Sequence, residues 1–113
     1  MENARSRTDY IRQVLDAWRR TPETTGVVRP NDRRLAADLY DRGVPLHAVE
    51  NAMVLAAARR ICRPSRLPPL QPMRSLHYLQ PVIDEVLALR ASPDYFRDLQ
   101  SHIDRALNSQ PLR

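Results

Sequence analysis

The run Ala52-Met53-Val54-Leu55-Ala56-Ala57-Ala58 constrains the fold of this chain more than any other feature. It lies in the middle of a segment, His47 to Cys62, that the sequence predicts to be one helix. A helix at the surface of a globular domain has a single apolar stripe, whereas this one is apolar on almost every side. We therefore expect it to be the central helix, buried among the others.

Two helices are predicted before this segment from their apolar period and their end signals. The first runs from about Asp9 to Arg20 after an N-cap at Thr8, and its stripe consists of Tyr10, Ile11, Val14, Leu15 and Trp18. The second follows an N-cap at Asn31, and its apolar face carries Leu35, Ala36, Leu39 and Tyr40. Gly43 then stands where a C′ glycine ends a helix.

Two helices are predicted after the central segment. Ser75 opens a turn through Tyr78, and Pro81 suits the first position of the next helix, whose inward residues are Val82, Ile83, Val86 and Leu87. Ser92-Pro93-Asp94 combines a cap, a first-turn proline and an acid at the positive helix end. The last apolar stripe consists of Tyr95, Phe96, Leu99, Ile103 and Leu107.

These elements predict an all-α fold, a compact bundle of four to five helices. We expect residues 1–113 to form a single helical domain, because 113 residues leave no room for a second core. Residues 1–7 and 108–113 are predicted to be frayed tails. Residues 63–73 are predicted to form a rigid proline-rich loop with extended or polyproline-like geometry.

The composition excludes several classes of protein. A single cysteine, Cys62, rules out an internal disulfide and suits a reducing compartment, and we expect its thiol to be buried. No apolar run predicts a signal peptide or a membrane span, so we expect a cytoplasmic and bacterial protein without a membrane partner. The histidines His47, His77 and His102 lack metal-ligand spacing. We expect no metal, no cofactor and no enzymatic activity.

The basic residues are distributed unevenly. All 18 are arginines, and the net charge is +5. No acid occurs between Glu50 and Asp84, while that interval contains Arg59, Arg60, Arg63, Arg66 and Arg74. Codon usage in a GC-rich genome is one explanation for arginine in place of lysine, but it does not account for the missing acids. Cations near a helix C-terminus account for two or three of these arginines.

A second basic group consists of Arg29, Arg33 and Arg34, partly offset by Asp32 and Asp38. Guanidinium groups suit phosphate, so both groups predict contacts with the backbone of DNA or RNA and a steep dependence on salt. Whether the eight arginines share a face is left open by the sequence.

The two helices around Gly43 have helix-turn-helix spacing. Apolar residues follow that glycine at the three positions where such motifs bury them, Leu46, Val49 and Ala52. In the second helix, His47 and Asn51 are candidates for base or partner contacts, although Glu50 would meet a negatively charged groove. A plain helical hairpin is the favoured interpretation.

Two short patterns resemble bacterial, plasmid and phage replication-initiation proteins, especially their DnaD-like helical module. Tyr10, Val14 and Trp18 form Y-x3-V-x3-W, similar to a signature of that module, and Arg74-Ser75-Leu76-His77-Tyr78-Leu79 is similar to a segment in replication proteins of mobile elements. The resemblance implies binding of single- or double-stranded DNA and contacts with a helicase loader. It makes Tyr10 and Trp18 candidate contact residues.

Together these observations predict a non-enzymatic nucleic-acid-binding module in a bacterial replication, mobile-element or defence assembly. The alternative is a helical adaptor, or a small subunit of a larger protein or ribonucleoprotein complex, that does not bind nucleic acid by itself. A homodimer is a third prediction, because the apolar helix leaves room for self-association.

Overall fold

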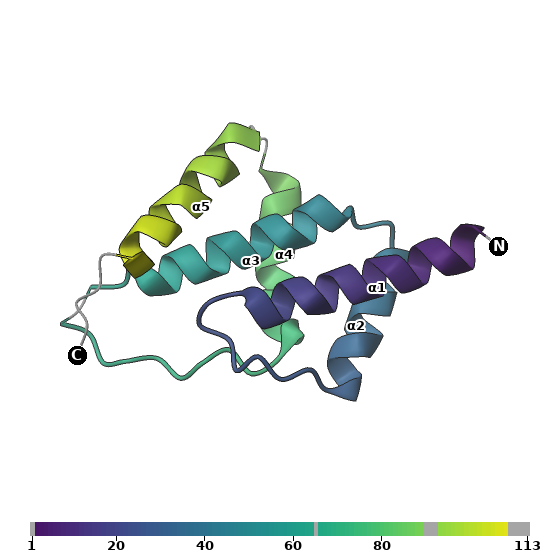
Figure 1. Ribbon diagram of the computed structural model, residues 1–113, viewed down its shortest axis with the longest axis horizontal. Coiled ribbons are helices and arrows are strands. Elements are labelled where there is room, and N and C mark those ends of the chain that lie inside the picture. The colour runs from purple at the N-terminus through teal and green to yellow at the C-terminus, as the bar shows by residue number, and fades with distance from the viewer. Residues whose placement is uncertain (1, 65, 90–92, 109–113) are drawn as a thin grey trace.

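The computed structural model describes residues 2–64, 66–89 and 93–108, and its regular elements are helices. They are α1 (Glu2–Arg20), α2 (Pro30–Asp41), α3 (Leu46–Ile61), the short 3₁₀ helix η1 (Leu76–Leu79), α4 (Gln80–Ala88) and α5 (Pro93–Asn108) (Figure 1). Within these ranges the only β-type pairing is one isolated parallel bridge between Thr24 and Met73. The predicted all-α bundle is confirmed.

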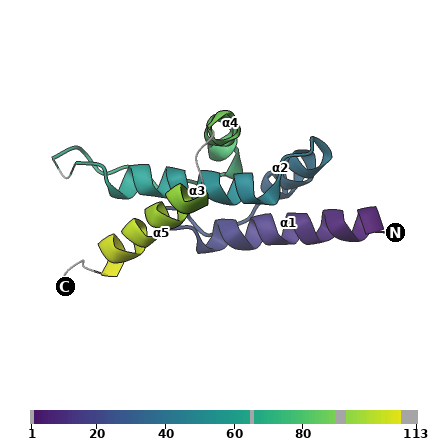
Figure 2. The same ribbon diagram turned by 90° about the horizontal axis from the view of Figure 1, so that it is seen from above.

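Helix α3 is the centre of the bundle, as its composition predicts. It packs against α1, α4, α5 and η1, and α4 lies on one side of it while α1 and α5 lie on the other (Figure 2). Its buried residues are Ala48, Val49, Ala52, Met53, Leu55, Ala56, Ala57 and Ala58. The alanines let neighbouring helices approach closely, so α3 can have helical neighbours on opposite sides.

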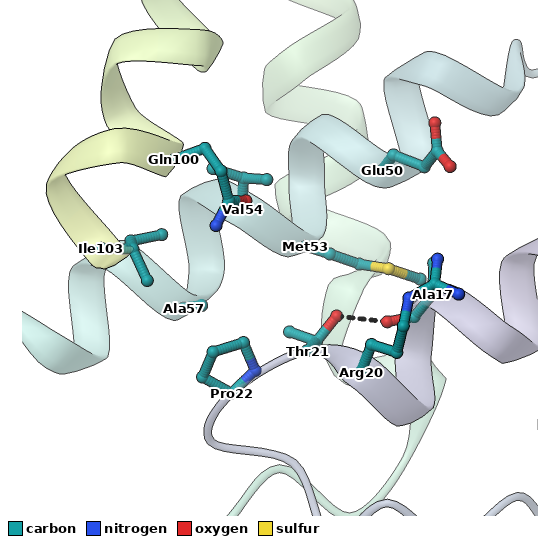
Figure 3. Close-up of a pocket in the computed structure, with 10 residues that line it drawn as sticks. All are labelled: Ala17, Arg20, Thr21, Pro22, Glu50, Met53, Val54, Ala57, Gln100 and Ile103. Carbon is teal, nitrogen blue, oxygen red and sulfur yellow. Dashed lines mark hydrogen bonds between the residues drawn. The ribbon is translucent and has the colours of Figure 1, made fainter. Parts of the chain in front are cut away.

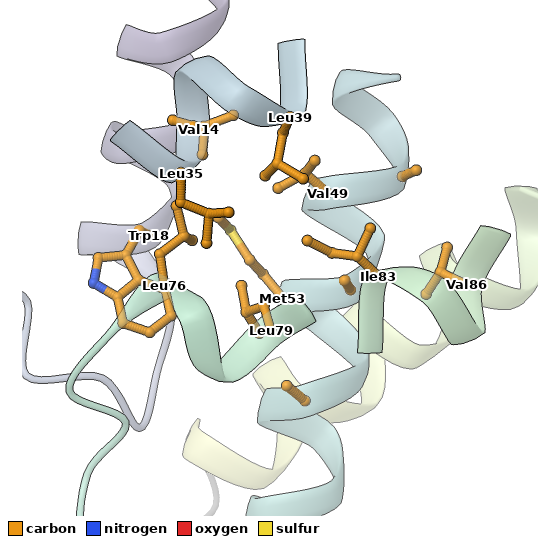
Figure 4. Close-up of a cluster of buried hydrophobic side chains, with 14 of the residues drawn as sticks. Val14, Trp18, Leu35, Leu39, Val49, Met53, Leu76, Leu79, Ile83 and Val86 are labelled. Carbon is orange, nitrogen blue, oxygen red and sulfur yellow. The ribbon is translucent and has the colours of Figure 1, made fainter. Parts of the chain in front are cut away.

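The main core forms where α1, α2, α3 and the segment from η1 into α4 meet (Figure 4). Trp18 and Leu39 are completely buried there, and Met53 from α3 lies beside them at 2% exposure. Leu76, Leu79 and Ile83 close the core from the η1–α4 side. Burying a large apolar side chain is worth about 1.5–3 kcal/mol, so this cluster is the main source of stability.

Helices α1 and α2 pack side by side and are joined to the start of α3 by polar contacts. The Tyr10 hydroxyl donates a 2.8 Å hydrogen bond to the carbonyl oxygen of Val44 in the α2–α3 turn. Gly43 has φ of 78° in that turn, which confirms it as the C′ glycine of α2. The predicted hairpin around Gly43 is therefore present.

Asp32 is buried and holds the beginning of α2 against the beginning of η1. One carboxylate oxygen accepts a 2.9 Å bond from the Arg29 backbone N–H. The other accepts a 2.9 Å bond from the Leu76 backbone N–H and a 3.2 Å bond from the Ser75 hydroxyl. Ser75 also caps η1, which confirms the turn predicted from Ser75 to Tyr78.

Two predicted helix starts are wrong. Helix α1 begins at Glu2, so residues 2–7 belong to it and are not a frayed tail, and Thr8 is inside the helix. The added turns are held by Arg7, whose guanidinium donates two 3.0 Å bonds to Asp41 at the end of α2. Helix α2 begins at Pro30, with Arg29 in place of Asn31 as its N-cap residue, because proline suits the first helical position.

Three residues predicted to face inward are exposed. Leu87, Tyr95 and Leu107 are 48%, 47% and 39% exposed, because α5 packs mainly against α3, and α4 mainly against α3 and η1. Cys62 is exposed as well, contrary to the expected buried thiol, because it follows the last turn of α3. Asn108, the first residue of the predicted tail 108–113, is the last residue of α5. The predicted cap at Ser92 and the rest of that tail lie outside the described residues. None of the described helices has the length and apolar character needed to cross a membrane.

Candidate nucleic-acid interface

Two arginines of the acid-free stretch form ion pairs with carboxylates from other parts of the chain. Arg59 in the last turn of α3 bonds both carboxylate oxygens of Glu85 in α4, and its Nη2–Oε2 distance is 2.7 Å. This hydrogen bond raises the pKa of Arg59 and lowers the pKa of Glu85. Arg59 is therefore half of an ion pair between α3 and α4, at the surface, since its side chain is 55% exposed.

Arg60 is even more enclosed, since its side chain is only 6% exposed. Its Nε lies 3.3 Å from Glu23, its Nη1 lies 3.4 Å from the Tyr78 hydroxyl, and its Nη2 donates to the carbonyl oxygen of Gln71. The guanidinium carbon also lies 5.7 Å from the centroid of the Tyr78 ring, within cation–π range. Arg60 thus joins three parts of the chain and has little surface to offer an anion.

The remaining members of this group divide into bonded and exposed residues. Arg63 donates to the carbonyl oxygen of Pro68 at 3.1 and 3.4 Å. Arg66 and Arg74 are exposed and form no hydrogen bond or ion pair with the residues that the structure describes. Of the five arginines of the acid-free stretch, three therefore bond to other parts of the chain, and two have no bonded partner among the described residues.

The second basic group, at the beginning of α2, forms fewer contacts with the rest of the chain. Arg29, Arg33 and Arg34 are exposed at the beginning of α2, and none has an ion pair within the described ranges. The sequence suggested Asp32 and Asp38 as their counter-charges, but both carboxylates bind other groups of the chain. Asp32 is buried as a cap, and Asp38 lies 3.4 Å from Arg42. These three guanidinium groups are available for an anionic partner.

Two adjoining hollows run between α1 and α2 beside these arginines. Their volumes are about 340 and 520 Å³, and both are lined by Ile11 and Arg33. Apolar residues, including Leu15 and Val28, contribute to the lining, while Asp16 is the only acid among the described residues that line it. We call the arginines that line the two hollows the α1–α2 arginine surface: Arg7, Arg12, Arg19, Arg29, Arg33 and Arg34.

The α1 members of this surface were not singled out from the sequence. Arg12 and Arg19 are seven residues apart, which places them on one face of a helix, and that spacing could have identified them. Each forms a 2.8 Å ion pair three residues back along α1, with Asp9 and with Asp16. Such exposed pairs are weak and open readily, so both arginines can still contribute to an anion site.

The eight predicted arginines do not share one face. One group, Arg29, Arg33 and Arg34, lies at the beginning of α2. The other group lies at the C-terminal end of α3, with Arg59 and Arg60 in its last turn and Arg63 just beyond it. The two groups are separated along the longest axis of the molecule (Figures 1 and 2). A single uninterrupted patch made by both groups is therefore not present.

The predicted aromatic contacts are buried and unavailable. Tyr10 is 8% exposed and Trp18 is 0% exposed, and both belong to the main core. Burial raises the pKa of the Tyr10 phenol to about 12. Their spacing produces the apolar stripe of α1, and this explains the Y-x3-V-x3-W pattern without any contact to a base.

The predicted recognition helix is the central helix α3, which other helices surround. His47 and Asn51 line a hollow of about 700 Å³ between α3, α4 and α5, together with Val86 and Phe96. Helices α4 and α5 therefore flank the face that would have to enter a major groove. The hairpin around Gly43 serves packing, as the plain-hairpin interpretation expects.

A smaller hollow of about 290 Å³ lies between the end of α1, α3 and α5 (Figure 3). Met53, Ala57 and Ile103 line it with apolar surface, and Arg20 and Glu50 also contribute. It contains no second arginine, so it is not part of the basic surface. Among the described residues, no three His, Cys, Asp or Glu side chains are grouped closely enough to hold a metal ion.

Comparisons with protein families, with curated proteins and with solved structures gave no match for this chain. The resemblance to DnaD-like modules therefore stays a prediction from its two short patterns.

Proposed function

We propose that this chain is a non-enzymatic module that binds nucleic acid through the α1–α2 arginine surface. The observation that carries the proposal is the set of three neighbouring arginines, Arg29, Arg33 and Arg34, which are exposed and have no carboxylate partner among the described residues. Unpaired guanidinium groups bind phosphate without first giving up an internal ion pair.

The proposed contacts go mainly to the phosphate backbone. Among the described residues, no aromatic side chain lines the two hollows, so bases have no ring on which to stack. On the helix predicted to read bases, the candidate residue Asn51 lines a hollow between α3, α4 and α5. We therefore expect affinity to depend on salt and to differ little between sequences.

The test compares two double variants that change the net charge equally. Arg33→Ala/Arg34→Ala removes charge from the proposed surface, and Arg97→Ala/Arg105→Ala removes the same charge from the exposed face of α5. Fluorescence anisotropy with labelled single-stranded DNA, duplex DNA and RNA is measured at several salt concentrations. Circular dichroism checks that both variants remain folded.

We expect the α2 variant to weaken binding to every sequence and to reduce the salt slope by about 0.9 for each duplex phosphate that it no longer neutralises. The α5 variant should bind almost like the unchanged chain. Equal weakening in the two variants would mean that only net charge matters, and this result would contradict a localised surface. The assembly served by such binding, in replication, a mobile element or defence, stays a prediction from the sequence.

An acidic protein partner is the second candidate, and one observation favours it. The hollows between α1 and α2 have apolar lining from Ile11, Leu15 and Val28 beneath their arginines. An amphipathic segment with acidic flanks would use both the apolar and the basic parts, whereas a nucleic-acid backbone uses only the basic part. Poly-L-glutamate binding in the absence of any nucleic-acid binding at low salt would support this candidate over the first.

A further inference from the structure

The loop after α3 contains a segment that the basic surface does not explain. Its sequence is Arg66-Leu67-Pro68-Pro69-Leu70-Gln71-Pro72, which contains R-x-x-P-x-x-P. All seven residues are exposed, and they belong to no helix or β bridge. Arg66 and Leu67 lie in a turn and a bend before the prolines. A polyproline II helix has three residues per turn, so Pro69 and Pro72 would recur along one edge of it.

The body of the protein holds this segment by its carbonyl groups. Arg63 donates to the carbonyl oxygen of Pro68, and Arg60 donates to the carbonyl oxygen of Gln71. The two acceptors are three residues apart, which is the repeat of a polyproline II helix. Two arginines at the end of α3 thus hold one edge of the segment and leave its other edges open.

Both ends of the segment are fixed as well. The Leu67 N–H donates a 3.1 Å bond to the carbonyl oxygen of Pro64, closing a turn before the prolines. After them, Met73 is 1% exposed and its N–H donates a 2.7 Å bond to the carbonyl oxygen of Glu23. A segment held at both ends loses little conformational entropy when it binds a partner.

We propose that residues 68–72, with Arg66 in the turn before them, are a polyproline II ligand for a partner protein with an aromatic-lined groove and an acidic side chain beside it. Prolines in this geometry pack against aromatic rings. Leu67 and Leu70 are 40% and 45% exposed, which is apolar surface that the chain itself leaves uncovered. Arg66 has no partner among the described residues, so its charge selects an acidic side chain next to the groove.

In this proposal, Arg60 and Arg63 position the loop and do not bind an anion. Glu23 and Tyr78 in turn hold the Arg60 side chain in place. The proposed ligand shares no residue with the α1–α2 arginine surface, so either proposal can fail without the other.

The test uses a ¹⁵N-labelled SH3 domain that recognises R-x-x-P-x-x-P ligands, titrated with the full chain and followed by NMR. The variants are Pro69→Ala/Pro72→Ala and Arg66→Glu. The controls are Pro81→Ala, at the exposed start of α4, and Arg97→Ala on α5. A synthetic peptide of residues 63–74 is titrated in parallel.

We expect shifts at the aromatic groove of the domain, an affinity reduced by about tenfold or more in both loop variants, and no change in the controls. The full chain should bind more tightly than the peptide, because its loop is already ordered. The proposal is overturned by an absence of shifts with the full chain, by equal affinity of the loop variants, or by binding of the peptide alone. The last result would show that the fold conceals the segment.

Discussion

The carboxylate of Asp32 accepts hydrogen bonds from two helix starts that lie far apart in the sequence. Through Arg29 it caps α2, and through Ser75 and Leu76 it fixes the beginning of η1. A buried acceptor of this kind matters mainly because its removal leaves buried donors without partners. The position of η1 against α2 therefore depends on one side chain.

We expect Asp32→Ala to lower the free energy of unfolding by about 2–4 kcal/mol, because the backbone N–H groups of Arg29 and Leu76 lose a charged acceptor. Urea denaturation followed by circular dichroism measures this change. Asp38→Ala in the same helix is the control, since Asp38 is exposed and its ion pair with Arg42 is worth about 1 kcal/mol at most. Similar destabilisation by the two variants would contradict the capping role.

The Tyr10 hydroxyl gives a prediction about alkaline pH. Burial raises the pKa of this phenol from 10.0 to about 12, so the folded state favours the neutral form. The resulting stability is fully present below pH 10 and is lost as the pH rises from there toward 12. We expect Tyr10→Phe to lower the free energy of unfolding by about 1 kcal/mol, because the hydrogen bond to Val44 is removed.

Denaturation of both proteins at about pH 9 and about pH 11 tests the alkaline effect. The unchanged chain should lose more stability between these two values than Tyr10→Phe does. An identical decrease in both would show that the phenol does not titrate differently in the folded state.

At the scale of elements, α5 is the least supported helix. Its contacts are mainly with α3, where Ile103 forms a small cluster with Ala57 and Ala58. Of its described residues, Phe96 belongs to the main core and Leu99 packs against it, whereas the other helices share that core with two or more neighbours. We therefore expect α5 to open before the other helices do.

We expect Ile103→Ala to lower the free energy of opening α5 by about 2 kcal/mol or more, because Ile103 is 1% exposed. Hydrogen exchange measured by NMR should show faster exchange in α5 and much smaller changes in α3. Leu107→Ala is the control in the same helix, since Leu107 is 39% exposed. Uniform acceleration along the whole chain would mean that α5 unfolds only together with the core.

The elements show what a sequence of this kind can predict. Helix α3 was identified because a helix that is apolar all round must have neighbours on several sides. Gly43 and Ser75 were identified because a C′ position and a cap demand particular residues. Leu87 and Tyr95 were wrongly predicted to face inward, because an apolar stripe does not show how much of it the neighbouring helix covers.

The candidate site was harder to predict, for a reason that concerns distance along the chain. The acids that neutralise Arg59 and Arg60 are Glu85 and Glu23, which are 26 and 37 residues away. A count of charges along the sequence cannot include such pairs. The same count made Arg29, Arg33 and Arg34 look partly offset by Asp32 and Asp38, although the Asp32 carboxylate is buried in the core.

At the scale of the whole molecule, arginines without a carboxylate partner among the described residues lie toward both ends of an elongated body. The principal extents are 50, 31 and 22 Å, and α2 and α5 lie toward opposite ends of the longest axis (Figure 1). The α2 end exposes unpaired arginines, while α5 carries Asp94, Asp98 and Asp104 against Arg97 and Arg105.

Arginines without a carboxylate partner among the described residues lie at the beginning of α2 and, as Arg63 and Arg66, in the loop after α3 toward the other end of the long axis (Figure 1). In the field of a large polyanion either end of such a molecule is attracted, so collisions in more than one orientation can begin an encounter. Added salt shortens the range of this attraction, so its benefit is greatest in dilute electrolyte.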